Sequence, residues 1–157
     1  MEIRLINASD KDQLNALILE FWRDHIRKKT LNKLLPFVAY KDIEKEIKWQ
    51  TDQFLSKKYI TYVAEKNGQI IGYISGLVKD QPDKVLDKAG YIKNWYVKDG
   101  FRKNGVGKKL WKSIEYYFRN QKCSHLLLDT FSENTDARTI YTKMGFIEEN
   151  INMVKMF

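Results

Sequence analysis

Apolar positions in the first third of the chain recur mainly with helical spacing. A short strand is predicted at residues 3–6, and apolar residues then recur every three or four positions from Asp10 to Lys28, which predicts a helix. A second helix is predicted from Lys41 to Leu55. The segment between these helices, around Leu31 to Pro36, is expected to be a loop or a short turn of helix. Two helices therefore precede the main group of strands.

The middle of the chain changes to the pattern of strands. β-Branched and aromatic residues are concentrated at residues 59–64 and 69–78, and the Asn67-Gly68 dipeptide between them is typical of a two-residue hairpin turn. A further strand is predicted at residues 89–97, after a polar segment that contains Pro82. The pattern therefore predicts a hairpin followed by one more strand.

The last third of the chain alternates helices and strands. Helical spacing from Asn104 to Asn120 is followed by an apolar run from Leu126 to Phe131, which is typical of a strand covered on both faces. A short helix is predicted from Asn134 to Lys143, and the residues from Gly145 to Phe157 are expected to form one or two closing strands. This order of elements predicts an α+β fold with a mixed sheet.

The composition is that of a folded domain without membrane segments. Hydrophobic residues make up 43% of the 157 residues, so residues 1–157 are expected to form a single domain. No apolar run has the length of a membrane span, and residues 1–6 lack a signal peptide's apolar stretch, so a cytoplasmic protein is expected. Cys123 is the single cysteine and the histidines, His25 and His125, are isolated in the sequence, so no metal site is predicted.

The charge of the chain favours an anionic partner. The formal net charge is +8, which suits a nucleic acid, an acidic membrane surface or a phosphorylated cofactor. The lysines are spread along the whole chain, whereas a nucleic-acid-binding domain would gather them on one face. A basic nucleic-acid-binding domain is therefore the weaker alternative.

A basic, glycine-containing loop lies between the strand that ends at Val97 and the helix that follows. The residues from Arg102 to Gly107 read Arg-Lys-Asn-Gly-Val-Gly. The first N–H groups of a helix lack internal partners and carry the positive end of the helix dipole, so anions bind there. Gly105 and Gly107 permit unusual dihedrals and a close approach to the backbone. The pattern indicates a phosphate-binding loop, although a glycine-rich helix start without a ligand would look the same.

A second motif follows the next strand. Asn134, either Ala137 or Arg138, and Tyr141 recur at helical spacing and so share one helix face; the helix runs to Lys143, and Gly145-Phe146 breaks it. Taken alone, this segment equally suits an amphipathic helix whose tyrosine packs in the core. Together with the loop from Arg102 to Gly107, however, its order and spacing resemble the GNAT superfamily of N-acetyltransferases.

The resemblance implies a fold and a reaction. The fold would be α+β, with a mixed, mostly antiparallel central sheet of about six to seven strands flanked by about four helices. The reaction would be direct attack of a primary amine on acetyl-coenzyme A, with acetyl-coenzyme A as co-substrate and no metal. The partners would be acetyl-coenzyme A and an amine acceptor, with no membrane, and the chain would be a monomer or a homodimer.

The resemblance also implies roles for individual residues. The backbone from Arg102 to Lys108 would bind the pyrophosphate, the edge of the strand at Trp95–Val97 and Asn134 would contact the pantetheine arm, and Tyr141 would protonate the departing thiolate. The Val97 N–H would face the thioester oxygen. Neutralising Arg102 would weaken cofactor binding. The predicted cofactor-binding residues are Trp95, Tyr96, Val97, Arg102, Lys103, Asn104, Gly105, Val106, Gly107, Lys108, Asn134, Ala137, Tyr141 and Lys143.

One part of the family pattern is missing. Many members carry a Glu or Asp on the strand that here contains Lys93 and Asn94. Asn94 can position a water but cannot take a proton at neutral pH. Glu65, Asp129, a water chain and bulk solvent remain as alternatives for removing the amine's proton, and a coenzyme A-binding module without catalysis remains the main rival to an enzyme.

The acceptor is expected between the first two helices and the hairpin at residues 59–78. It would be a polyamine, another small amine, a peptide N-terminus or a lysine. The aromatic residues of this region, which equally suit core packing, are Phe21, Trp22, His25, Tyr40, Trp49 and Tyr62. The acidic residues that would attract a cationic amine, or be merely solvated, are Glu20, Asp24, Glu44 and Glu46.

Overall fold

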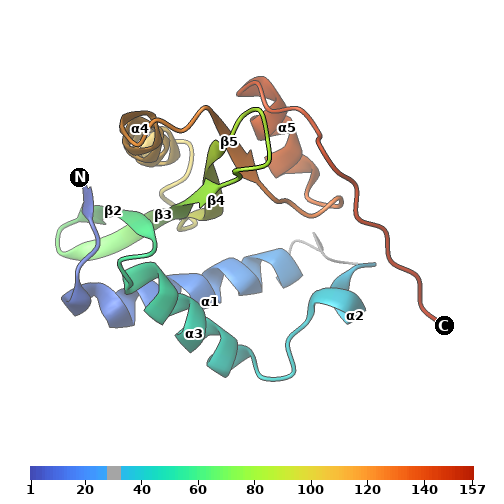
Figure 1. Cartoon of the computed structure of the whole chain (residues 1–157). Coiled ribbons are helices and arrows are strands. Elements are labelled where there is room, and N and C mark those ends of the chain that lie inside the picture. Colours follow the sequence, from blue (N-terminus) through green and yellow to red (C-terminus); the bar gives the residue numbers. More distant parts are fainter. Residues whose placement is uncertain (28–32) are drawn as a thin grey trace.

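The structure is a computed structural model that describes residues 1–27 and 33–157 (Figure 1). Its elements follow one another as a strand, three helices, three strands, a helix, a strand and a helix. Their bounds are β1 Glu2–Leu5, α1 Lys11–Arg27, α2 Leu35–Val38, α3 Ile43–Leu55, β2 Ile60–Lys66, β3 Gln69–Asp80, β4 Lys88–Val97, α4 Val106–Asn120, β5 His125–Leu128 and α5 Thr135–Lys143, with a 3-10 turn at Ala8–Asp10 after β1.

The strands form one sheet in the order β1-β2-β3-β4-β5. The first four strands pair antiparallel, and β4 pairs with β5 in parallel. Helices α1 and α3 lie on one face of the sheet and α4 lies on the other (Figure 1). Alternate side chains of each strand therefore enter two separate cores: Tyr73 packs with Leu14 and Ile47, and its neighbour Ile74 packs with the α4 side chains.

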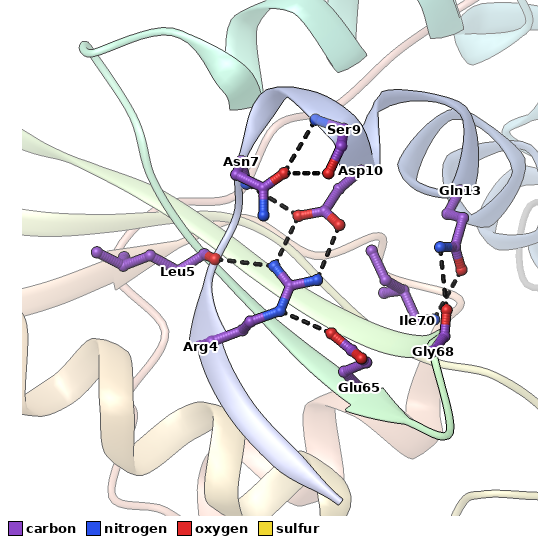
Figure 2. Close-up of polar contacts among 9 residues, drawn as sticks. All are labelled: Arg4, Leu5, Asn7, Ser9, Asp10, Gln13, Glu65, Gly68 and Ile70. Carbon is purple, nitrogen blue, oxygen red and sulfur yellow. Dashed lines mark hydrogen bonds and ion pairs between the residues drawn. The ribbon is translucent and has the colours of Figure 1, made fainter.

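A charged cluster ties β1 to the start of α1 and to β2 (Figure 2). The Arg4 guanidinium donates to both carboxylate oxygens of Asp10, at 2.7 and 2.8 Å, and to Glu65 at 2.7 Å. Asp10 is 3% exposed and also accepts from the Asn7 N–H. The pKa of Asp10 is lowered, chiefly by the hydrogen bond from Arg4. This cluster fixes the edge of the sheet far from β5.

The α+β prediction and the mostly antiparallel sheet are confirmed, but the strand count is lower. Five strands are present in the described ranges instead of about six to seven, because no strand forms in residues 146–157. A strand needs a neighbour for its backbone hydrogen bonds, and this segment has none in the described part of the chain. Strand β5 likewise ends at Leu128 and not at Phe131, since the chain leaves β4 there.

The helices differ in detail from the prediction. Five are described instead of about four, because residues 35–38 form the short helix α2, which was one of the two predicted possibilities for the segment around Leu31 to Pro36. Leu31 and Asn32 of that segment, and Lys28 at the predicted end of the first helix, lie outside the described residues. No helix in residues 1–27 or 33–157 has both the length and the apolar character needed to cross a membrane.

Candidate active site

The loop after β4 ends in a left-handed residue that starts α4. Gly105 is the N-terminal cap of α4 and has φ 76°, and no side chain of the described residues caps the helix. A side chain at Gly105 would meet open space but would be strained by this backbone conformation. The first N–H groups of α4 therefore point out of the helix without a protein side-chain acceptor, as an anion site requires.

Gly107 has a different role from Gly105. A Cβ atom at Gly107 would lie 3.2 Å from the Trp95 ring, so the missing side chain lets the first turn of α4 pack directly on β4. The sequence pattern assigned both glycines to ligand approach. For Gly105 this role stays a prediction, whereas Gly107 brings the helix start next to the strand.

Arg102 points toward α1 and not outward from the loop. Its Nε donates to the Val97 carbonyl at 2.7 Å, and its two terminal nitrogens contact Asp24 at 2.5 Å and Asp99 at 3.2 Å. The guanidinium also lies over the Tyr96 ring, 5.2 Å from its centroid. Arg102 therefore holds the loop against the end of β4. Lys103 in the loop and Lys108 in the first turn of α4 are exposed lysines beside the helix start.

The end of β4 has an open edge. Strand β5 pairs with β4 only as far as Ile92 opposite Leu128, so no strand in the described ranges pairs with Lys93–Val97 on that side. A β-bulge lies at the same point, because Ser75 pairs with Asn94 and Gly76 pairs with Ile92, which leaves Lys93 as the extra residue. The bulge and the end of β5 together open a gap between β4 and β5.

The hydrogen-bond pattern gives the direction of the backbone groups at this open edge. Lys98 donates its N–H to the Ile71 carbonyl, and antiparallel pairs alternate, so Tyr96 also bonds to β3. The N–H and C=O groups of Trp95 and Val97 therefore point to the open side. The Val97 carbonyl accepts a hydrogen bond from Arg102, and the Val97 N–H faces the gap.

Tyr141 comes to the same place from α5. Its ring lies 6.3 Å from Trp95 and 5.9 Å from Phe146, between centroids, and burial raises the pKa of its phenol. The hydroxyl is therefore protonated at neutral pH and can donate a proton. Asn134 caps α5, and its side-chain oxygen accepts from the Ala137 N–H at 3.4 Å. Lys143 is exposed in the last turn of the same helix.

Asn94 lies in a chain of polar side chains that crosses from β4 to α3. Its amide nitrogen lies 3.4 Å from Gln50 Oε1 and 3.3 Å from the Tyr73 hydroxyl. Gln50 in turn donates to Glu46 at 2.9 Å. Tyr73 is fully buried, and burial raises the pKa of its phenol. Because both neighbours engage the Asn94 nitrogen, the amide oxygen is available to accept a hydrogen bond.

Residues 18–146 of this chain match one family, described as the acetyltransferase (GNAT) family. The chain belongs to the GNAT family. The match begins within α1 and spans α3, the strands β2 to β5, the loop from Arg102 to Gly107 and the α5 segment that ends at Phe146. The resemblance inferred from the two motifs is thereby confirmed.

Two curated relatives of this GNAT chain carry acetyltransferase names. An uncharacterized N-acetyltransferase of Methanocaldococcus jannaschii is 34% identical over 92 residues, which are 57% of this chain and 54% of that protein. N-alpha-acetyltransferase 30 of Dictyostelium discoideum is 33% identical over 87 residues, which are 55% of this chain and 45% of that protein. The chain thus spans about half the length of the curated relatives it matches.

Solved structures show the same fold at low sequence identity. A tetramutant of the BH1408 protein of Bacillus halodurans superposes with a TM-score of 0.81 at 18% identity, over 100% of both chains. The aminoglycoside N-acetyltransferase AAC(6')-Iy in complex with CoA superposes with a TM-score of 0.70 at 18% identity, over 99% of both chains. Both structures share the fold of this chain along nearly its whole length.

The aromatic residues expected around the acceptor divide into two groups in this GNAT chain. Phe21, Trp22, His25 and Tyr40 form one cluster on α1 and the segment before α3, with ring centroids 4.3 to 6.3 Å apart for the contacting pairs. Trp49, in contrast, is 51% exposed, and Tyr62 packs with the side chains around α4. The cluster also contains Phe131, whose ring centroid lies 5.9 Å from that of His25.

The acidic residues near the site already have partners. Asp24 contacts Arg102, and Glu20 pairs with Lys98 at 3.3 Å. Of the alternatives for a general base, Glu65 accepts from Arg4 on the far edge of the sheet, and Asp129 accepts from the Tyr91 hydroxyl just beyond β5. Neither carboxylate is directed at the open edge of β4 by these contacts.

Sequence reasoning missed three residues of the site. Gln50 and Tyr73, which hold Asn94, sit in a helix and a strand whose patterns indicate only core packing. Phe131 follows β5 and was counted as part of that strand. No local signal marks these residues, because their role depends on the register that places α3 and β3 beside β4. Among the described residues, no group of three or more His, Cys, Asp or Glu side chains could hold a metal ion.

Proposed function

We propose that this GNAT chain transfers the acetyl group of acetyl-coenzyme A to a primary amine. The observation that carries the proposal is the open edge of β4, which runs from Lys93 to Val97 and leads directly to the uncapped start of α4. The amides of a pantetheine arm can pair with such an edge like an added strand. The diphosphate of the same molecule then reaches the N–H groups at the start of α4.

Two neighbours in the GNAT fold support this choice of ligand. AAC(6')-Iy is described in complex with CoA, and a glucosamine-6-phosphate N-acetyltransferase of Arabidopsis thaliana has a TM-score of 0.67 at 21% identity over 99% of this chain and 97% of its own. The name of each neighbour describes transfer to an amino group. In this chain the backbone from Arg102 to Lys108 would hold the diphosphate, with Lys103 and Lys108 adding positive charge.

The proposed reaction is a direct attack in a ternary complex. The amine nitrogen bonds to the thioester carbonyl carbon, and the carbon–sulfur bond breaks to release coenzyme A. The Val97 N–H donates to the thioester oxygen as negative charge develops on it. The Tyr141 hydroxyl gives its proton to the departing sulfur, for which a raised pKa keeps it in the protonated form.

The amine must lose a proton during the same reaction. The Asn94 oxygen is placed to accept a hydrogen bond from the amine or from a water, since Gln50 and Tyr73 engage its nitrogen. An amide does not take the proton, so the proton passes to solvent through water. Alignment of amine and thioester then supplies a large part of the rate acceleration.

The amine would enter between α1, α3 and the end of β4. Asn94 would lie at the inner end of the path of the amine, and the aromatic cluster with Phe21, Trp22 and His25 lies along α1. A polyamine, another small amine, a peptide N-terminus and a lysine all present the required primary amine. The acceptor panel therefore includes one compound of each class.

The first test is binding. Acetyl-coenzyme A at about a hundred times its Kd would stabilise the folded chain by about 2.7 kcal/mol, which raises the melting temperature by several degrees. Desulfo-coenzyme A is the control for the thiol, because it keeps the diphosphate and the pantetheine arm. No shift with either ligand would contradict the proposed site, and a shift with duplex DNA alone would favour the nucleic-acid alternative.

The second test is turnover. Release of free coenzyme A thiol with at least one amine of the panel is expected, with the acetylated amine identified by mass spectrometry. The substitution of Lys93 and Asn94 for the usual acidic residue is the observation that favours a binding module without catalysis. Tight binding with no thiol release above the amine-free blank would establish that alternative.

A further inference from the structure

Two exposed lysine side chains converge on the ring of Tyr91, within β4. The ammonium nitrogen of Lys79 lies 5.7 Å from the centroid of this ring, and that of Lys93 lies 5.9 Å from it. Within residues 1–27 and 33–157, neither lysine forms an ion pair. A tyrosine ring attracts a cation weakly and does not neutralise its charge. Two unneutralised ammonium groups near one ring therefore favour an anion beside it.

Tyr91 lies on the face of the sheet that α1 and α3 cover. Its neighbours face α4, because Ile92 packs in the α4 core and a Cβ atom at Gly90 would meet a ring of α4. Successive side chains of a strand point to opposite faces, so Tyr91 points toward α1 and α3. Lys93 is the extra residue of the β-bulge, and its ammonium group lies over Tyr91. The lysine pair and Asn94 thus share the face from which the amine is proposed to enter.

The side chains that face this side of β4 change in charge along α3. Gln50 donates to Glu46 at 2.9 Å, and its Oε1 lies 3.4 Å from the amide nitrogen of Asn94. One turn later, the end of α3 packs on Tyr59, which is a neighbour of Tyr91. A carboxylate therefore lies on one side of Asn94 along α3, and the lysine pair lies on the other.

Asp129 is an acidic residue at the lysine end. Its carboxylate accepts a hydrogen bond from the Tyr91 hydroxyl. Burial and this hydrogen bond raise the pKa of the Tyr91 phenol, so the phenol is neutral at neutral pH and adds no negative charge. Two ammonium groups against one carboxylate leave the three charged side chains net positive.

We propose that the acceptor of this GNAT chain is a small primary amine that also carries an anionic group, a phosphate or a carboxylate, and that Lys79 and Lys93 bind this group. The amine nitrogen lies at the Asn94 oxygen. The inference rests on the proposed acetyl transfer, because it names the acceptor of the same site. It also gives Lys93 a role in specificity, at the position where many members of the family carry an acidic residue.

The spacing of the residues limits the size of the acceptor. Lys93 directly precedes Asn94, and the Cα atoms of successive residues are about 3.8 Å apart. An anionic group a few bonds from the amine can therefore reach Lys93 while the amine stays at Asn94. A polyamine has cations at both ends and would place one of them beside the two lysines, so electrostatic repulsion disfavours a polyamine.

The first experiment measures binding without chemistry. The chain is titrated with amines, with and without saturating desulfo-coenzyme A, and binding is followed by NMR. The amines form two matched pairs, phosphoethanolamine with ethanolamine and β-alanine with β-alaninamide. The anionic member of at least one pair is expected to bind about tenfold more tightly than its neutral partner, and that pair identifies phosphate or carboxylate as the anion. Equal affinity within both pairs, or no binding of any of the compounds, would overturn the inference.

Substitutions test whether the two lysines cause this preference. Lys79→Met and Lys93→Met remove the ammonium groups and keep much of the apolar stems. Each is expected to lower the preference by about threefold, the double variant to abolish it and Lys93→Arg to retain it, while affinity for the neutral amines stays within about threefold. A preference that survives in the double variant would contradict the inference.

The matched control for these substitutions is Lys66→Met. Lys66 is also an exposed lysine above an aromatic ring, with its ammonium nitrogen 5.6 Å from the centroid of Phe101, but it lies at the end of β2 next to the hairpin turn. Lys66→Met is expected to leave the preference for anionic amines unchanged. Circular dichroism of each variant checks that the fold is retained.

Thiol release separates this inference from the proposed acetyl transfer. The anionic amine that binds more tightly is expected to be acetylated with a higher kcat/KM than its neutral partner, and Lys93→Met is expected to reduce this difference. Lysine-dependent binding without thiol release from any amine would contradict acetyl transfer and support the anion site. Thiol release with neutral amines and no lysine-dependent preference would support acetyl transfer and overturn the anion site.

Discussion

Gly105 is the left-handed residue from which α4 starts at the proposed phosphate site. Its φ of 76° starts α4 and directs the first N–H groups outward. Replacing it with alanine places a Cβ in the left-handed region at a cost of about 1–2 kcal/mol, which the loop can avoid by changing conformation. We expect Gly105→Ala to weaken coenzyme A binding by about tenfold or more in isothermal calorimetry.

The matched control is a glycine with the same backbone strain elsewhere. Gly68 also has φ 76° and open space at its Cβ position, but it lies in the β2–β3 turn. Gly68→Ala is expected to lower stability as Gly105→Ala does and to leave coenzyme A affinity unchanged. Equal loss of affinity in both variants would show that strain alone, and not the helix start, explains the effect.

Tyr141 is the proposed acid. Tyr141→Phe keeps the ring that packs on Trp95 and Phe146 and removes only the hydroxyl. We expect kcat to fall by about 10²-fold while coenzyme A affinity stays within a few fold. Tyr116→Phe, on an exposed tyrosine, is the control. Unchanged turnover in Tyr141→Phe would remove this residue as the proton donor.

The pH dependence of turnover tests the same residue. Burial raises the pKa of the Tyr141 phenol above its ordinary value of about 10, so the acid stays protonated through the neutral range and is lost only at more alkaline pH. Turnover is therefore expected to show no fall from loss of this proton below about pH 10. A fall near neutral pH that disappears in Tyr141→Phe would contradict the raised pKa.

At the scale of elements, Arg102 joins the loop before α4 to α1. The family resemblance predicted a phosphate-binding role, but the guanidinium contacts the Val97 carbonyl, Asp24 and Asp99. We expect Arg102→Met to lower the melting temperature and to leave the salt dependence of coenzyme A binding nearly unchanged. Lys103→Met should do the opposite, with a smaller salt slope and little loss of stability. A reduced salt slope in Arg102→Met would instead support a phosphate role for its guanidinium.

The Arg4 cluster at the other edge of the sheet leads to a prediction about the free energy of unfolding. Arg4 lowers the pKa of buried Asp10, so the carboxylate contributes stability above its unfolded pKa of about 4, and this stability is lost as the pH falls through the lower folded pKa. Arg4→Met is expected to cost about 3 kcal/mol at neutral pH in urea unfolding and to make unfolding less acid-sensitive. Arg119→Met, which removes an exposed pair with Glu115, should cost less than about 1 kcal/mol.

The order of the elements could be predicted from the sequence because each has a strong local pattern. The Asn67-Gly68 turn, the helix after Gly105 and the Asn134 cap are all set by neighbouring residues. The end of β5 could not be predicted in this way. Leu126–Phe131 is uniformly apolar, and only the divergence from β4 after Leu128 decides where pairing stops.

The candidate site was predictable where it is built from local sequence. The α4 start and Tyr141 carry signals within a few residues of themselves. The Asn94 contacts do not, because they depend on the bulge at Lys93 and on how α3 packs against the sheet. The orientation of Arg102 was missed for the same reason, since its partner Asp24 lies on α1, far away in the sequence.

At the scale of the whole molecule, the oligomeric state decides how stability depends on protein concentration. The chain is predicted to be a monomer or a homodimer. If the folded state is a dimer, unfolding releases two chains, and the melting temperature is expected to rise with protein concentration. Differential scanning calorimetry at several concentrations measures the effect. A melting temperature independent of concentration would argue against a dimer that is present at the transition.

The uncapped start of α4 also bears on how such a site can change over generations. Its proposed ligands are main-chain N–H groups, which every amino acid except proline supplies. Mutations at the exposed Asn104 can therefore accumulate while the groups that meet the phosphate stay in place. The BH1408 tetramutant, with a TM-score of 0.81 at 18% identity, shows how different two sequences with this fold can be. What inheritance must preserve is the shape of the turn at Gly105 and the packing of the buried Val106 behind it, more than the identity of an exposed side chain such as Asn104.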